Sequence, residues 1–166
     1  MKRFLLLFAI AIVTSTAVFA QTTEIWVVRH AEKDKSNPND QNPGLSDEGK
    51  SRAGDLAKYL EKVTFDVAYS SPYKRTRETL DSLIIQKVIS YKDNKSLADS
   101  VKKNYTGKTV IIAGHSNTVL EIIEAFGGKR PIDLLTDDDY DYIFRLTISD
   151  DKTKVRMDHY GRPHHL

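Results

Sequence analysis

Short apolar runs alternate with amphipathic stretches along most of the chain, and this pattern predicts strands alternating with helices. Two of the runs, Glu24–Val28 and Thr109–Ala113, have the continuous apolar character of strands that are buried on both faces. A third strand is predicted at Asp66–Ser70. These elements favour an α/β domain with the three strands in its interior.

Helices are predicted between the strands. One covers Asp47–Lys62 and begins with Ser46 as its capping residue, because acidic residues and then a regularly spaced apolar face follow this serine. A second covers Pro72–Ile85, with Ser71 as cap and the proline in the first position. Weaker patterns predict a strand at Lys87–Tyr91 and a helix at Ser96–Asn104. A regular apolar face predicts a helix from about Val119 to Phe126, and the last two apolar stretches predict a hairpin of Tyr142–Ser149 with Lys154–Tyr160.

The first twenty residues have the pattern of a secretory signal peptide. Lys2 and Arg3 precede an apolar core at Phe4–Val13, and the small residues Val18 and Ala20 fit a cleavage site after Ala20. The apolar core is too short to cross a bilayer as a helix. We therefore expect residues 1–20 to be removed, and residues 21–166 to form one domain outside the cytoplasm, periplasmic or secreted, without stable membrane insertion.

Composition narrows the classes of function. The chain has 25 Lys and Arg against 23 Asp and Glu, and loss of Lys2 and Arg3 leaves 23 basic residues and no formal net charge. This balance gives no indication of nucleic-acid binding. The chain has no cysteine, which excludes disulfides and thiol chemistry and leaves the stability of an exported domain to its core.

Chemically capable side chains follow the predicted strands directly. Arg29 and His30 follow the first strand, Arg75 lies near the start of the helix that follows Ser70, and His115 and Ser116 follow the strand that ends at Ala113. Ligands of open α/β sheets bind beyond the carboxyl ends of the strands. Arginine suits phosphate or carboxylate oxygens, and histidine suits nucleophilic or proton-transfer chemistry. The pattern predicts an anion site, with the polar loop Lys33–Leu45 as its rim.

A run of three acidic residues, Asp137–Asp139, precedes the predicted hairpin. It is compatible with a metal site, but solvated residues at a helix start are the more common use of such a run. We therefore predict no metal and no cofactor.

Taken together, Arg29-His30, Ser71-Pro72 with Arg75 and Thr79, and Gly114-His115-Ser116 resemble the histidine phosphatase superfamily, the phosphoglycerate-mutase-like fold. The resemblance spans nearly all of residues 21–166. Ala31 stands where the family has glycine, which keeps a small residue. The resemblance implies a three-layer α/β/α sandwich around a mostly parallel sheet with an antiparallel edge strand, and the alternation of strands and helices agrees with it.

The resemblance also implies roles for the site residues. His30 would be the nucleophile that takes the phosphoryl group, and Arg29, Arg75 and His115, with Ser116, would form the phosphate pocket. Preplaced cations around the equatorial oxygens stabilise the transition state of such a transfer without a metal. The implied activity is a phosphatase that acts on phosphomonoesters or phosphohistidine, with a small phosphorylated molecule or a phosphohistidine protein as its partner.

Many members of the family protonate the leaving group with a carboxylic acid, often a glutamate between the arginine-bearing helix and the second histidine. Between Thr79 and Asn104 the chain has no glutamate, and Asp93 is the best placed of three aspartates there. A turn residue beside Asn94 is the alternative for Asp93. Without a donor, substrates with good leaving groups would be strongly favoured.

Three other functions remain open from the sequence. A phosphate-binding or regulatory module could keep the pocket without turnover, since fold alone does not imply activity. A phosphomutase is disfavoured by export and by the short chain. A metal hydrolase using His30, His115 and nearby carboxylates is the remaining alternative.

Overall fold

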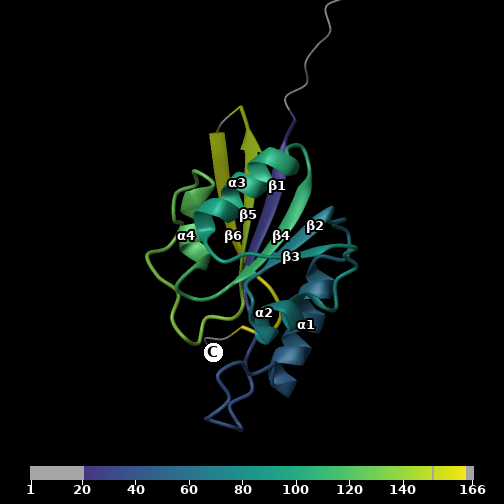
Figure 1. Ribbon diagram of the computed structural model, residues 1–166, viewed down its shortest axis with the longest axis vertical. Helices are drawn as coiled ribbons and strands as arrows, with labels where there is room; N and C mark the ends of the chain where they lie inside the picture. The colour runs from purple at the N-terminus through teal and green to yellow at the C-terminus, as the bar shows by residue number, and fades with distance from the viewer. Residues whose placement is uncertain (1–20, 151, 164–166) are drawn as a thin grey trace, which may run out of the picture.

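A six-stranded sheet forms the centre of the protein, and its strand order is β3-β2-β4-β1-β5-β6 (Figure 1). The computed structural model describes residues 21–150 and 152–163. The predicted signal peptide lies outside the described residues. The strands are β1 (Thr23–Arg29), β2 (Val67–Ser70), β3 (Val88–Ser90), β4 (Thr109–Gly114), β5 (Tyr142–Ser149) and β6 (Lys152–His159).

Strands β1 and β4 are neighbours and run parallel at the centre of the sheet. Their apolar residues are buried, as their continuous apolar runs predict. The register pairs Arg29 with Gly114, and the backbone N–H of His30 donates to the carbonyl of Gly114 at 2.9 Å. This register brings His30 and His115 to the same edge of the sheet.

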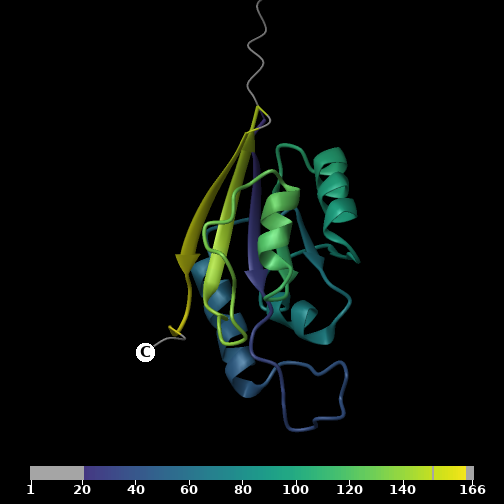
Figure 2. The same cartoon turned by 90° about the vertical axis from the view of Figure 1, so that its left-hand side faces the viewer.

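Helices cover both faces of the sheet, which gives the expected three layers (Figure 2). α1 (Asp47–Tyr59) and α2 (Lys74–Leu80) pack on the face that carries Trp26 and Ile111. α3 (Asn94–Asn104) and α4 (Val119–Ala125) pack on the opposite face. Among the described residues, none of the helices has the length and apolar character needed to span a membrane.

The predicted hairpin of β5 and β6 is confirmed, and it supplies the antiparallel edge of the sheet. β5 runs antiparallel to β1, and β6 runs antiparallel to β5. The start of α1 is also as predicted, because the Ser46 hydroxyl accepts a hydrogen bond from Gly49 N at 3.2 Å.

The second helix differs from its prediction at both ends. α2 begins at Lys74, so Pro72 precedes it, and Ser71 is not its cap, because the residue at the cap position is Tyr73. The helix ends at Leu80 instead of Ile85. Leu83 and Ile85 pack against the core while Ile84 is 98% exposed, and this alternation is extended rather than helical.

The acidic run 137–139 does not start a helix. It lies in an irregular segment between α4 and β5. Asp139 is buried, and its carboxylate accepts a hydrogen bond from Thr136 N at 2.6 Å. The run therefore forms a turn that a side-chain carboxylate closes on the backbone.

Candidate active site

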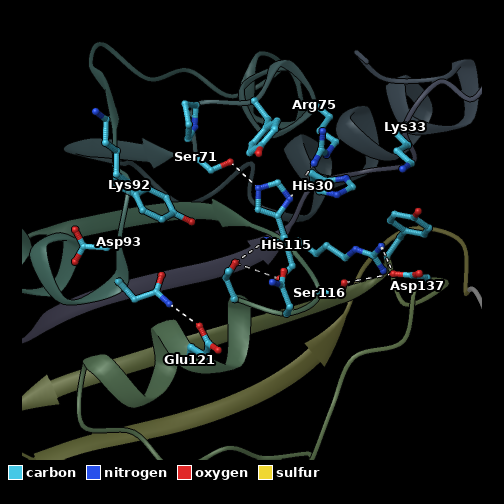
Figure 3. Close-up of a pocket in the computed structure, with 18 of the residues that line it drawn as sticks. His30, Lys33, Ser71, Arg75, Lys92, Asp93, His115, Ser116, Glu121 and Asp137 are labelled. Carbon is cyan, nitrogen blue, oxygen red and sulfur yellow. Dashed lines mark hydrogen bonds and ion pairs between the residues drawn. The ribbon is translucent and has the colours of Figure 1, made fainter. Parts of the chain in front are cut away.

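A cavity of about 850 Å³ lies at the carboxyl ends of β1, β2 and β4 (Figure 3). It is lined by the predicted site residues Arg29, His30, Arg75, His115 and Ser116, and by Asp93. The sheet edge supplies Arg29, His30, Ser71 and His115, and α2 supplies Arg75. The rim carries further basic residues, Lys33, Lys35 and Lys92, of which the first two belong to the predicted rim loop. The cavity therefore gathers positive charge around two histidines.

Arg29 is a buried cation that is fixed from several sides. It is 4% exposed, and its Nη1 donates to the carbonyls of Thr136 at 2.7 Å and Asp139 at 3.2 Å. Its guanidinium lies 4.1 Å from the centre of the Tyr140 ring. Burial lowers the pKa of Arg29 from its ordinary value, yet an arginine stays charged in proteins. The segment around Tyr140 thus holds a preplaced positive charge at the end of β1.

His30 is held with one nitrogen occupied and the other available. Its Nδ1 lies 2.7 Å from the carbonyl oxygen of Ala31. A carbonyl only accepts, so Nδ1 carries the proton and Nε2 keeps its lone pair. Burial, followed by the neighbouring positive charge of Arg29, lowers the pKa of His30 to about 3. His30 is consequently a neutral imidazole with a nucleophilic Nε2 at physiological pH.

Arg75 and His115 form the other side of the pocket. Arg75 Nη2 lies 3.5 Å from His115 Nδ1, and its guanidinium lies 4.4 Å from the centre of the Tyr73 ring. The ring centres of His30 and His115 are 5.2 Å apart. Burial, followed by the charge of Arg75, lowers the pKa of His115 to about 4. Two arginines and two histidines, the side chains suited to binding and transferring a phosphoryl group, therefore converge on one volume.

Ser71 has a place in this site that its sequence position did not indicate. Its hydroxyl lies 2.8 Å from His115 Nε2 and 2.8 Å from Thr76 Oγ1. Figure 3 shows the His115 ring between Ser71 and His30. The serine that resembled a helix cap is instead a partner of the second histidine.

Ser116 and Asp137 meet at the opposite wall of the cavity. The Ser116 hydroxyl lies 3.5 Å from Asp137 Oδ1, and the same carboxylate oxygen lies 3.7 Å from Arg29 Nη2. Asp137 is almost fully exposed, with 96% of its side chain accessible. Ser116 thus lines the pocket beside Asp137, an acidic side chain that would compete with a bound anion for Arg29.

Asp93 lines the cavity, but its carboxylate is occupied at the start of α3. It accepts hydrogen bonds from Ser96 N at 2.8 Å and from Ser96 Oγ at 2.5 Å. These bonds hold the pKa of Asp93 below its ordinary value. A carboxylate that caps a helix and stays ionised is poorly suited to donate a proton.

Several lining residues carried no signal in the sequence analysis. Tyr73, Tyr140 and Glu121 lie in the cavity wall. Tyr140 contacts Arg29 from more than a hundred positions further along the chain, so local patterns do not reveal it. Glu121 is on the first turn of α4, where its carboxylate accepts a hydrogen bond from Asn94 at 2.9 Å.

Comparison with known families identifies this arrangement. A family model described as histidine phosphatase superfamily (branch 1) matches residues 25–116, more than half of the chain. The chain belongs to the histidine phosphatase superfamily. The matched region includes Arg29, His30, Arg75 and His115, which meet in the cavity.

Solved structures share the fold over nearly their whole length. The protein histidine phosphatase SixA in complex with tungstate has a TM-score of 0.65 at 15% identity, with 82% of this chain and 96% of that chain covered. The putative phosphohistidine phosphatase SixA from Agrobacterium tumefaciens has a TM-score of 0.58 at 22% identity, with 85% and 98% covered. A phosphoserine phosphatase from Entamoeba histolytica, in complex with 3-phosphoglyceric acid, has a TM-score of 0.57 at 15% identity, with 87% and 100% covered.

At these identities the structural likeness shows a common fold. A search of curated proteins gave no match.

Proposed function

We propose that this protein is a phosphatase that hydrolyses phosphomonoesters or phosphohistidine through a phosphohistidine intermediate on His30. One observation carries the proposal: the unprotonated Nε2 of His30 lies in a cavity that is also lined by Arg29, Arg75 and His115. A nucleophile among preplaced cations is what phosphoryl transfer requires.

In the first step, Nε2 of His30 attacks phosphorus and the bond to the leaving group breaks. The imidazole becomes positively charged, and the hydrogen bond of its Nδ1–H to the Ala31 carbonyl, at 2.7 Å, stabilises that charge. Arg29 and Arg75 stabilise the charge that develops on the equatorial oxygens, and both lie in place before the substrate arrives.

In the second step, water attacks the phosphorus and breaks the N–P bond. His30 regains its neutral form, and inorganic phosphate leaves. Protein groups supply the nucleophile and the positive charge, so we propose that no metal is needed. A chelator is therefore expected to leave turnover unchanged.

The comparison with the two SixA structures supports phosphohistidine as a substrate class. One is described as a protein histidine phosphatase and the other as a putative phosphohistidine phosphatase. The phosphoserine phosphatase among the solved structures equally supports phosphomonoesters. The cavity of about 850 Å³ and its lysine rim are compatible with a phosphoryl group on either kind of carrier.

The test is turnover of a generic aryl phosphate by residues 21–166, with and without chelator, beside the His30→Ala variant. Metal-independent release of phosphate that His30→Ala abolishes is the expected result. Binding of phosphate without turnover would instead indicate a phosphate-binding or regulatory module. Transfer of the phosphoryl group to a second position of the substrate would indicate a phosphomutase.

We further propose that the protein is exported and acts in the periplasm or outside the cell. The support is the pattern of residues 1–20, with its two basic residues, apolar core and small residues. Intact mass of the native protein should show a chain that begins at Gln21. Recovery of the full-length chain, stably embedded in the membrane, would contradict this localisation.

A further inference from the structure

Two buried hydroxyl groups connect His115 to the backbone before α2. The Ser71 hydroxyl lies 2.8 Å from His115 Nε2 and 2.8 Å from Thr76 Oγ1. Thr76 is fully buried, and its hydroxyl lies 2.8 Å from the carbonyl of Tyr73 and 3.1 Å from that of Ser71. The result is a continuous chain of hydrogen bonds from the imidazole to a backbone carbonyl.

The two ends of this chain fix the direction of every proton in it. At one end, Arg75 faces His115 Nδ1 at 3.5 Å, and a guanidinium can only donate. At the other end, the carbonyls of Tyr73 and Ser71 can only accept, so the single hydroxyl proton of Thr76 points to one of them. Ser71 must then donate to Thr76, and His115 Nε2 must donate to Ser71.

We propose that Ser71 and Thr76 are positioning residues that hold neutral His115 in its Nε2–H tautomer, so that Nδ1 is the atom that takes up a proton when phosphate binds. This inference rests on the proposed function only for the identity of the anion. The tautomer itself follows from the hydrogen bonds of the resting protein.

The reason for proton uptake is the chemistry of the bound anion. Phosphate oxygens accept hydrogen bonds, and an imidazole nitrogen with a lone pair cannot donate one. The charged and titratable neighbours of His115 are Arg75 and Tyr73 on the α2 side and Arg29 and His30 at the end of β1. The positive charges of the two arginines disfavour protonation of His115, and a bound phosphate dianion offsets those charges.

The resting state agrees with this sequence of events. The pKa of His115 is lowered to about 4, by burial and then by Arg75 and Arg29, so the ring is neutral near pH 7. A phosphate dianion in contact with the ring favours its charged form. His115 therefore changes from a hydrogen-bond acceptor at Nδ1 to a donor as the pocket fills.

The first test reads the tautomer directly, by long-range ¹H–¹⁵N correlation spectra of histidine-labelled protein near pH 7. Wild-type His115 should show the pattern of the Nε2–H tautomer, and Ser71→Ala should shift it toward a mixture with the Nδ1–H form. Ser70→Ala is the matched control, because the Ser70 hydroxyl donates to the Ser71 carbonyl and has no bond to His115. A wild-type Nδ1–H tautomer, or an unchanged tautomer in Ser71→Ala, would overturn the proposal.

A second pair of variants keeps the test decisive if Ser71→Ala does not fold. Thr76→Val removes the acceptor of the Ser71 proton, which frees Ser71 to donate to Nε2 and moves the imidazole proton toward Nδ1. Thr76→Ser keeps the hydroxyl and should keep the wild-type tautomer. The same tautomer in both variants would overturn the proposal.

The consequence for binding is measured by titrating inorganic phosphate near pH 8 in two buffers of different ionisation enthalpy. The wild-type protein and Thr76→Ser should take up about one proton for each phosphate bound, and Thr76→Val clearly less. Phosphate binding without proton uptake by the wild type would contradict the inference. Failure of phosphate to bind any of the proteins would contradict the proposed function, and the spectra would still decide the tautomer.

Discussion

Thr79 ties the backbone next to the proposed nucleophile to the helix that carries Arg75: its hydroxyl accepts a hydrogen bond from the backbone N–H of Ala31 at 2.9 Å. The same hydroxyl donates to the carbonyl of Arg75 at 2.7 Å. Ala31 in turn accepts from the imidazole of His30. One fully buried side chain thus sets the position of His30 relative to Arg75.

Replacement of this threonine is the first prediction. Thr79→Val leaves the buried N–H of Ala31 without a partner, which is expected to cost about 1–3 kcal/mol in the free energy of unfolding. The shift of His30 against Arg75 should also lower kcat, by up to about 10²-fold. Thr79→Ser keeps the hydroxyl and should retain most of the free energy of unfolding and most of kcat. Equal activity of the Val and Ser variants in a phosphatase assay would show that Thr79 has no positioning role.

Arg75 is expected to contribute to the transition state. Its guanidinium lies on the pocket wall with His115, so Arg75→Ala should lose about 10²-fold or more in rate, similar to removal of one preorganised donor. Arg77→Ala is the matched control, since Arg77 is exposed on the same helix. A similar loss in both variants would point to a general effect of charge or of helix stability.

The leaving group gives a third prediction. Asp93 caps α3, and asparagine caps helices as well as aspartate does, so Asp93→Asn removes the carboxylic acid and keeps the cap. We expect aryl phosphates or phosphohistidine to be preferred over simple alkyl phosphates, and Asp93→Asn to change kcat/KM on aryl substrates little. Comparable kcat/KM on both classes in the wild type, with a large selective loss on alkyl phosphates in Asp93→Asn, would identify Asp93 as a working general acid.

The buried histidines predict how stability depends on pH. Burial lowers the pKa of His30 from 6.5 to about 3. Between these values the unfolded chain binds a proton that the folded protein does not, so the free energy of unfolding falls as the pH decreases from about 6.5 towards 3. His115, with a pKa lowered to about 4, acts in the same direction.

Urea unfolding at a series of pH values checks this prediction. The His30→Ala variant should lose less stability than the wild type between about pH 7 and pH 4, because one of the groups responsible is absent. The same pH dependence in both proteins would mean that His30 is not buried as a neutral imidazole.

The positions of the main site residues follow from the sequence because strand ends are a local signal. The apolar runs before Arg29 and before His115 end where β1 and β4 end, and parallel strands present their carboxyl ends at one edge. The pairing of Arg29 with Gly114 joins two strands that are far apart in the sequence. The local pattern of the sequence does not contain this pairing.

Other parts of the site depend on contacts between distant segments. Ser71 before Pro72 has the pattern of a helix cap, but a hydrogen bond to His115, 44 positions away, uses its hydroxyl instead. The turn around Asp139 is held by Arg29 from 110 positions away. Local propensity favours a helix start at this acidic run. The segment instead forms a turn whose carbonyls accept hydrogen bonds from the buried Arg29.

The most direct test of the account is detection of phosphate on His30 during turnover. Protein mixed with a labelled aryl phosphate and quenched within the first turnovers should carry label on the peptide that contains His30. Acid should release this label, because N–P bonds are acid-labile, and the His30→Ala variant should neither carry label nor turn over substrate. Near-normal turnover by His30→Ala, or label on a different residue, would contradict the mechanism.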